Sequence, residues 1–207
     1  MAIVNGYITL AELKTYLGLS GSGQDENLEN AVEGASREID AICGRYFYQT
    51  SSEVKYFTPV SRTYLEIPDL SSTSGLEVKI DTTDNGTHDT TLAIDTDFYL
   101  KPLDAGEKEV EGVERQPYTH IFILDSRSSE RFNPDIVKSV KVTGLWGFSG
   151  KPNAIKQATY LQSARLFKRK DAPFSSYGGQ NTGTVNLERN FDPDAMELIK
   201  GYRRNSL

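Results

Sequence analysis

The chain has 207 residues and a formal net charge of −6, with 37% hydrophobic and 25% charged residues. This composition is typical of one large or two small globular domains and excludes a mostly disordered chain. No segment approaches the roughly 18 apolar residues of a membrane-spanning helix, and the first residues lack the pattern of a secretory signal, so we expect synthesis in the cytoplasm and no membrane partner.

Two helices are predicted at the beginning of the sequence. Thr9 followed by Glu12 is a capping box, after which leucines recur at helical spacing until Gly18. A longer helix is predicted from Asp25, as its cap, to about Gly44. Its apolar stripe recurs at steps of three or four residues and consists of Leu28, Val32, Ala35, Ile39, Ile42 and Tyr46.

A block of short strands is predicted from about residue 53 to residue 148. β-Branched and aromatic residues gather there in short runs between turn residues. The candidate strands read VKYF, TYLEI, LEVKI, FYL, THIFIL and SVKVTGLWGF. Asn85 and Gly86 form the strongest short hairpin signal in the chain, and the charged segment from Pro102 to Pro117 is predicted to be a loop.

The last third of the sequence returns to helix. Pro152 suits the first position of a helix that ends in the basic residues 168–170. Small side chains on one face of this helix allow close approach of another helix; they are Ala154, Ala158, Leu161 and Ala164. Residues 175–186 are rich in Gly, Ser, Asn and Thr, as in a linker or an extended arm. Asp192 and Pro193 then begin a short amphipathic helix, whose shared face holds Ala195, Leu198, Ile199 and Tyr202.

The order of these elements predicts an α+β fold. Amphipathic helices near both ends of the sequence need partners, so we expect a small helical bundle from the N- and C-terminal segments with an inserted antiparallel β block. The predicted helical body comprises residues 1–52 and 149–174, and the predicted β block comprises residues 53–148. Residues 175–207 are predicted to form a separate C-terminal arm and helix. No repeat of fixed period is visible.

The stretch GLWGFSGKP has the strand–loop–helix context of a phosphate-binding loop. Such a loop needs a Ser or Thr hydroxyl after Lys151 to hold magnesium, and Pro152 stands there instead. We therefore interpret the stretch as a structural turn. In this interpretation Trp146 and Phe148 cover the seam between sheet and helix, and glycines such as Gly147 permit the turn.

Other candidate sites also have simpler structural interpretations. Residues 81–92 partly match a calcium loop, but a leucine replaces the bidentate glutamate, so a hairpin tip is preferred. His88 and His120 have no partner at metal-ligand spacing. Cys43, the single cysteine, fits a small buried thiol and excludes an internal disulfide. Ser149 does not lie in a nucleophile elbow. The sequence thus predicts no catalytic residue, metal or cofactor, although a carboxylate pair from distant segments stays open.

Charge is unevenly distributed along the chain. Residues 25–40 are rich in Asp and Glu, whereas residues 165–170 read RLFKRK. The basic run is best interpreted as a helix end that complements the helix dipole, with contact to an acidic neighbour or to DNA as alternatives. A net negative chain is unlike a free nucleic-acid binder.

Three stretches of the sequence resemble those of a known protein family. The first is YITLAELKTYLGL followed by LENAVEGASREIDAICGRYF. The second is VKVTGLWGFSGKPNAIKQATYLQSARLFKRKDAP, and the third is FDPDAMELIKGYRR. In their order and spacing they resemble the head–tail connector proteins, also called adaptor or head-completion proteins, of tailed bacteriophages with long tails. The central YLEIPDLSSTSGLEVKID also looks like the β insertion of longer members. These stretches cover much of the chain, although the β block is larger than in compact members.

The resemblance implies a structural virion protein without catalysis or cofactor. Such connectors form a ring, commonly of twelve subunits, between the portal protein and a tail or stopper protein in the neck of the virion. They extend the DNA channel without sequence-specific DNA contact. The small-residue face of Ala154, Ala158, Leu161 and Ala164 is assigned to ring packing. Portal docking is assigned to the end of the chain, namely Phe191, Leu198, Ile199, Tyr202, Arg203 and Arg204.

Two alternatives stay open at this point. The first is another virion part, a tail-terminator or tail-completion protein. The second belongs to a different class: a carbohydrate-binding or hydrolytic module built on the β block, with exposed Tyr and Trp as a platform.

Overall fold

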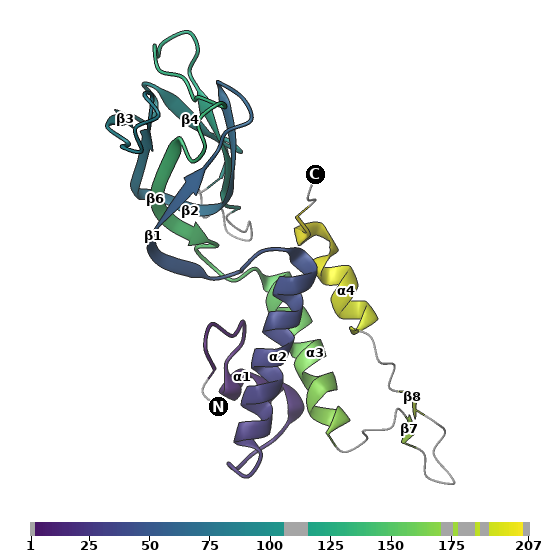
Figure 1. The fold of residues 1–207 in the computed structure, drawn as a ribbon. Coiled ribbons are helices and arrows are strands. Elements are labelled where there is room, and N and C mark those ends of the chain that lie inside the picture. The colour runs from purple at the N-terminus through teal and green to yellow at the C-terminus, as the bar shows by residue number, and fades with distance from the viewer. Residues whose placement is uncertain (1–2, 106–115, 171–175, 178–184, 187–190, 205–207) are drawn as a thin grey trace. The chain divides into compact units, whose positions relative to one another are not determined.

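The computed structural model describes residues 3–105, 116–170, 176–177, 185–186 and 191–204 (Figure 1). The chain forms two compact units. Residues 1–47 and 151–207 make up the first, here called the helical unit, and residues 48–150 make up the second, called the β unit. Helices in one unit and an antiparallel sheet in the other confirm the predicted α+β class.

Helices from both ends of the sequence build the helical unit. They are α1 (Leu10–Leu17), α2 (Asp25–Cys43), α3 (Asn153–Arg169) and α4 (Pro193–Ile199), which continues as a 3-10 helix over Lys200–Tyr202. α2 and α3 lie side by side (Figure 1). They run antiparallel, because Gly34 lies beside Leu166 whereas Glu38, further along α2, bonds to Gln162, which is earlier in α3. In the described part of the chain, no helix has the length and apolar character needed to cross a bilayer.

Local signals fix the ends of the first two helices. Thr9 and Glu12 form the predicted capping box. Gly18 and Gly44 end α1 and α2 in the left-handed conformation, each with φ of 65°. Two details of the second helix differ from the prediction. Asp25 is its first residue rather than its cap, and Tyr46 lies beyond its end and is 55% exposed.

The apolar core of the helical unit joins the first two helices to α3. Ile8, Leu13, Leu28 and Val32 are buried together, and Tyr160 and Phe167 of α3 pack against them. The apolar faces of helices from both ends of the sequence are therefore buried against one another, so neither end has to fold by itself.

A buried polar network fixes the N-terminal segment to α2. The Tyr7 hydroxyl donates to the Asp40 carboxylate and accepts the backbone N–H of Phe47 at 3.0 Å. The backbone N–H of Tyr7 donates to Ser36 Oγ at 3.1 Å, and Arg37 lies 3.2 Å from the second carboxylate oxygen of Asp40. Burial raises the pKa of both Tyr7 and Asp40. Tyr7, Ser36 and Asp40 each take part in a hydrogen bond and Arg37 adds an ion pair to Asp40, so the burial of these polar groups is largely compensated.

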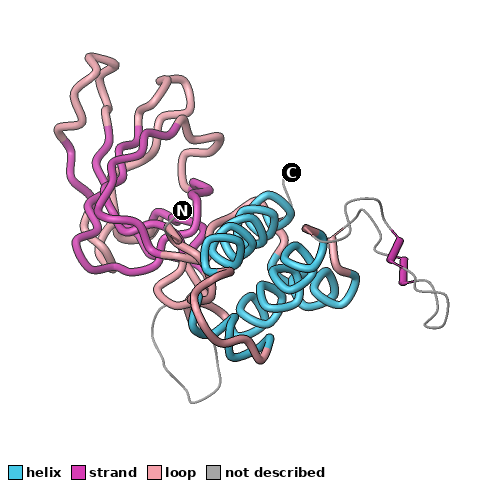
Figure 2. Tube along the Cα trace, turned by 90° about the horizontal axis from the view of Figure 1, so that it is seen from below, coloured by secondary structure: helices cyan, strands magenta, loops and turns pink. Residues whose placement is uncertain are grey.

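The described residues of the β unit form one antiparallel sheet of six strands, which is drawn as a tube in Figure 2. The strands are β1 (Gln49–Phe57), β2 (Tyr64–Ile80), β3 (Thr90–Leu92), β4 (Phe98–Lys101), β5 (Tyr118–Ile123) and β6 (Val140–Gly147). Their order is β1-β6-β2-β5-β4, and β3 pairs with β2. Gln49 pairs with Gly147, and the N–H of Phe148 donates to the carbonyl of Tyr48 at 3.3 Å, so the two ends of this unit lie next to each other.

β2 is one long strand where the sequence predicted two. Register shifts after Glu66, Leu70 and Ser72 allow its first half to pair with β5 and its second half with β6. These irregularities bend the strand and change its partner without ending it. Leu70 covers Gly144 so closely that a Cβ there would lie 2.7 Å from Leu70 Cδ1, which explains the glycine.

The predicted hairpin at Asn85-Gly86 is the turn between β2 and β3. The carboxylate of Asp81 accepts the backbone N–H groups of Thr83 at 3.0 Å and Gly86 at 2.8 Å. Burial of Asp81 opposes ionisation, but these donors outweigh it and hold the pKa of the carboxyl below its usual range. The Asp81 carboxylate therefore accepts hydrogen bonds from the turn and stabilises it.

Two predicted loops fall mainly outside the described residues. These are the charged segment from Pro102 to Pro117 and the arm at residues 175–186. Within the arm, the described residues form the paired two-residue strands β7 (Ser176–Tyr177) and β8 (Val185–Asn186).

Candidate assembly surfaces

Three helices cover three sides of α3. On the α1 side, Tyr160 stacks on Tyr16 with ring centroids 5.1 Å apart. On the α2 side, Leu166 lies beside Gly34. On the α4 side, Gln162 accepts the backbone N–H of Asp192 at 3.0 Å. Since residues of a helix are 100° apart, these contacts leave one side of α3 uncovered by the residues that the structure describes.

The uncovered side of α3 carries most of the predicted ring-packing face. Its exposed members are Asn153, Gln157 and Lys168, and its half-buried members are Ala154, Leu161 and Ala164. We call these six residues the α3 stripe. Ala158 is not part of it, because its side chain is 0% exposed and packs inside its own chain. The prediction for Ala158 is corrected accordingly, and ring packing by the other three residues stays a prediction.

α4 is fixed to α3 at its first turn. Asp192 caps α4 by accepting the N–H groups of Asp194 and Ala195 at 3.0 and 3.1 Å. The other carboxylate oxygen of Asp192 lies 3.4 Å from the Arg165 guanidinium. Asp192 therefore caps α4 and, through Arg165 and Gln162, holds α4 against α3.

The end of α4 is fixed to the end of α2. The N–H of Arg204 donates to the carbonyl of Cys43 at 2.8 Å, and Tyr202 packs edge-on against Phe47 with centroids 5.7 Å apart. Burial raises the pKa of the Cys43 thiol to about 11, so this cysteine is a neutral packed group near pH 7.

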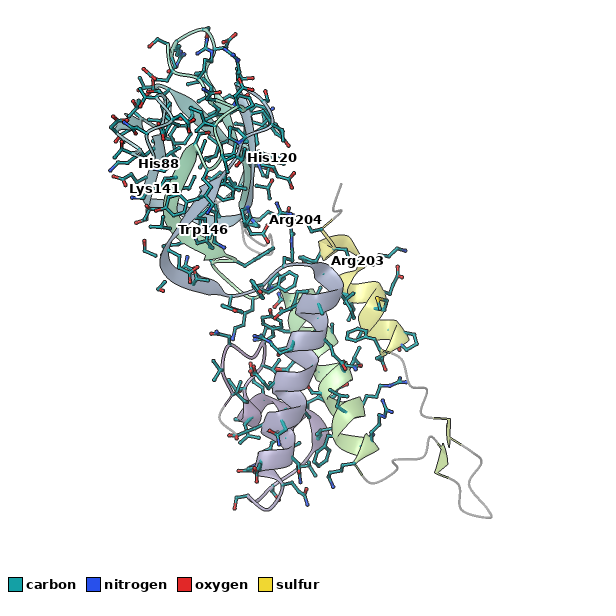
Figure 3. The ribbon with its side chains drawn as sticks, viewed as in Figure 1. His88, His120, Lys141, Trp146, Arg203 and Arg204 are labelled. Atoms are coloured by element: carbon teal, nitrogen blue, oxygen red, sulfur yellow. The ribbon has the colours of Figure 1, made fainter. Side chains whose placement is uncertain are left out.

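The structure gives Ile199 an internal role. Ile199 and Ala195 are both 0% exposed, so Ile199 belongs to the core of its own chain rather than to a partner surface. Leu198 is 37% exposed and Arg203 is exposed, while Phe191, Tyr202 and Arg204 are half-buried. Figure 3 labels Arg203 and Arg204 directly after α4. Portal docking by these other residues stays a prediction.

The residues of the predicted structural turn lie partly in the β unit and partly in the helical unit. Trp146 is 2% exposed within the apolar core of the β unit, where its indole N–H donates to the carbonyl of Glu53 at 3.0 Å. Gly147 has φ of 91°, a value that favours glycine. Pro152 is the residue before α3 rather than its first residue. The Lys151 ammonium donates to the carbonyl of Gly6 at 2.6 Å, which gives this lysine a partner within the chain.

The sequence reasoning missed a row of aromatic rings on the outer face of β2, β5 and β4. Tyr64 and Tyr99 each contact Phe122, with centroids 5.1 and 5.5 Å away, and His120 stacks on Tyr64 at 5.4 Å. The Lys101 ammonium lies 4.5 Å from the centroid of Phe122. All five side chains are half-buried. Their positions alternate with core residues along the predicted strands, and this alternation was the signal available in the sequence.

The two histidines lie in different surroundings. His120 belongs to this aromatic row, whereas His88 Nε2 lies 2.8 Å from the carbonyl oxygen of Lys138 and its ring contacts Tyr56. Figure 3 labels both histidines in the β unit. Among the residues that the structure describes, no group of three His, Cys, Asp or Glu side chains is placed to hold a metal ion.

A pocket of about 370 Å³ opens in the β unit. Ser72, Thr73, Asp95, Tyr99, Leu103 and Tyr118 are among the residues that line it. Of its lining residues, Asp95 supplies one carboxylate, whereas glycoside hydrolysis uses a pair. The described lining thus offers hydroxyl and aromatic groups together with one carboxylate.

No protein-family model matches this sequence, and no curated protein matches it. Solved structures do match. The fold is similar to that of chains in the neck of a GTA particle. One match comes from the neck of an empty GTA particle computed with C6 symmetry, with 13% identity and a TM-score of 0.55. Another comes from the neck of a native GTA particle computed with C12 symmetry, with 15% identity and the same TM-score. Each comparison covers 100% of this chain and 94% of the other, so the similarity includes both units.

Proposed function

We propose that this chain is a structural protein of the neck of a tailed phage or phage-like particle, made in the host cytoplasm. In this proposal it forms a ring that connects the portal to the tail and extends the DNA channel. The observation that carries the proposal is the end-to-end similarity to chains from the neck of the GTA, a phage-like gene transfer agent. A shared helical unit alone would be weaker support, since small helical bundles serve many functions.

A ring is supported by symmetry and by the α3 stripe. The similar neck structures were computed with C6 and C12 symmetry, which suit a closed ring of six or twelve copies. The stripe offers Leu161 and Ala164 at its centre, and small side chains allow helices of neighbouring subunits to approach closely. We favour twelve subunits.

The charge of the chain suits a channel through which DNA slides. Acidic residues outnumber basic ones in the whole chain, by 29 to 23. Tight DNA binding depends on lysines and arginines that neutralise phosphates. A wall with an excess of carboxylates therefore lets DNA pass without being held.

The proposed partners are the portal protein on one side and a tail or stopper protein on the other. α4 and the residues that follow it are the proposed portal contact, because Leu198 and Arg203 are exposed there. We further propose that the protein has no catalytic role or cofactor, in keeping with the structural role proposed here.

The ring is tested by native mass spectrometry and electron microscopy of the purified chain, alone and with its portal. We expect closed rings with the mass of twelve subunits, and the chain in purified virions. A chain that stays monomeric with the portal present, and is absent from virions, would falsify the proposal.

The tail-terminator alternative differs only in the neighbour that is bound. Immobilised protein is offered the portal and the tail tube separately. Retention of the tail tube, with no retention of the portal, would support that alternative.

A carbohydrate-binding role is the second candidate, and the aromatic row favours it. Rings such as Tyr64 and Tyr99 stack on sugars through their faces, although here each ring also contacts Phe122. Titration of the protein with host surface polysaccharide tests this role. Saturable binding that Tyr99→Ala removes would favour it.

A further inference from the structure

β1 forms one edge of the sheet in the β unit. On one side it pairs with β6, without interruption from Ser52 to Phe57. Among the described residues, no strand pairs with its other side. The backbone N–H and C=O groups of alternate residues point to that side, so they can accept a further strand.

The two edges of this sheet differ in how well they are protected. Natural edge strands often avoid unwanted pairing because they are very short, contain a proline or carry a bulge. The opposite edge, β4, has four residues. β1 has nine residues and no proline, and its one register shift lies before Ser52. The stretch from Ser52 to Phe57 is thus a regular edge without these protections.

The two faces of β1 carry different side chains. The Lys55 ammonium lies 4.9 Å from the ring centroid of Trp146, which fixes the face to which Lys55 belongs. Since side chains alternate along a strand, Glu53 lies on the same face. Val54 and Tyr56 lie on the other face, where they are 45% and 50% exposed. Exposed apolar side chains beside open backbone groups are typical of an edge that binds another strand.

The sequence of β1 is complementary to itself. Two identical strands can pair antiparallel across a two-fold axis, and side chains directly opposite each other then lie on the same face. With Val54 at the axis, Glu53 of each copy lies opposite Lys55 of the other. Both charged groups of the edge thus find an opposite charge in a second copy.

Charge also selects this register over the neighbouring ones. Because the open backbone groups belong to every second residue, the axis has to pass through a residue rather than between two residues. An axis at Glu53 places two glutamates opposite each other, and an axis at Lys55 does the same with two lysines. Like charges in such positions are destabilising, whereas opposite charges stabilise the pair. The register centred on Val54 is therefore favoured.

We propose that two copies of this chain pair through β1 when they are not part of a ring. A closed ring needs contacts between two different surfaces of the chain, so a contact of β1 with itself lies outside the ring. The inference therefore goes beyond the proposed function. Its consequence is that the free chain covers an edge that would otherwise pair with unrelated strands.

Sedimentation velocity of dilute protein tests the pairing, and we expect the chain outside rings to be a dimer. Glu53→Lys places lysine opposite Lys55 of the second copy, and Lys55→Glu places glutamate opposite Glu53. Each variant alone should raise the dissociation constant of the dimer at least tenfold at low salt. Asp104→Lys and Arg62→Glu make the same charge changes at exposed sites outside β1, and these controls should pair like the wild type.

Mixing the two charge variants is the decisive step. In a mixed pair, the lysines at positions 53 and 55 of one copy lie opposite the glutamates of the other, so the dimer should return. A chain that carries both substitutions should form dimers by itself. If the charges act only within one chain, for example through the contact of Lys55 with Trp146, neither sample recovers, and that result would overturn the inference.

The position of the axis has its own test. Val54→Cys should give a disulfide-linked dimer under mild oxidation, because position 54 lies opposite itself in the favoured register. Val60→Cys, at a site that is 84% exposed beyond the end of β1, is the control and should stay unlinked. The natural Cys43 is buried, so it does not compete. Equal linkage at both positions would show that collisions, and not pairing, bring the chains together.

Folding and ring formation are checked separately. Circular dichroism of each variant must match the wild type. Should Lys55→Glu fail this criterion, Val54→Lys replaces it, since it places two lysines at the axis from an exposed site and should abolish the dimer. A free chain that sediments as a monomer, with no linkage at position 54, refutes the pairing and leaves the ring intact. A dimeric chain that forms no ring with its portal refutes the proposed function alone.

Discussion

The carboxylate of Asp97 joins two loops of the β unit. It accepts the backbone N–H of Ala93 at 2.8 Å and the hydroxyl of Ser128 at 2.6 Å. These two hydrogen bonds hold the pKa of Asp97 below its usual range, and the bond from Ala93 has the larger effect. The charged form is thus the form that the folded β unit favours.

Acid should remove the stabilising effect of Asp97. A carboxyl whose pKa is lowered by folding stabilises the protein above its unfolded pKa of about 3.9, and this effect is lost as the pH falls through the lower folded pKa. Asp97→Asn should therefore be less stable than the wild type near pH 7, with a difference that shrinks below about pH 4. Urea denaturation from pH 3 to pH 7 measures this difference, with the exposed Asp135→Asn as control. A constant difference across that range would contradict the assignment.

The network around Tyr7 shows what a sequence leaves undetermined about single residues. Tyr7, Ser36 and Asp40 are polar residues from two segments, and nothing in their spacing indicates that they meet. They are buried because each finds a partner in the tertiary fold, Tyr7 and Asp40 with each other and Ser36 with the backbone of Tyr7. Partners of this kind are decided by packing, which no local pattern encodes.

Substitution of two neighbouring apolar residues of α4 should have opposite effects on the attachment of this helix. Ile199→Asp places a charge in the core and should release α4 from α3, with loss of roughly 1.5–3 kcal/mol of side-chain burial. Leu198→Asp, the matched variant on the exposed side, should leave α4 in place. Hydrogen exchange of residues 193–202 reports the release. Equal protection in both variants would show that Ile199 is not held in the core.

Element ends were predictable where the signal is local. The capping box at Thr9 and Glu12 and the glycine at position 44 act within one helical turn, so the sequence was sufficient. The continuity of β2 was not predictable, because its irregular pairing depends on β5 and β6. The same limit applies to the candidate surfaces: spacing alone suggested Ala158 and Ile199 as contact residues, and tertiary contacts place both inside.

Each unit of the molecule has its own apolar core, so damage to one core should stay local. Trp146→Ala should cost roughly 3–5 kcal/mol, the usual range for removal of a large buried aromatic side chain. We expect hydrogen exchange to accelerate across β1, β2 and β6 while α2 and α3 keep their protection. Val137→Ala, at an exposed site of the same unit, should change neither. Accelerated exchange in both units would mean that they unfold as one.

The neighbouring ends of the β unit, joined at Gln49 and Gly147, have a consequence for biosynthesis. On the ribosome, residues 48–150 are complete before any part of α3 has been made. The inserted sheet can fold at once, whereas the apolar side chains of α1 and α2 stay uncovered until α3 has emerged from the ribosome. Newly made chains therefore pass through an intermediate in which the sheet is folded and the helical unit is not. The exposed apolar side chains of α1 and α2 are a binding site for chaperones during that interval.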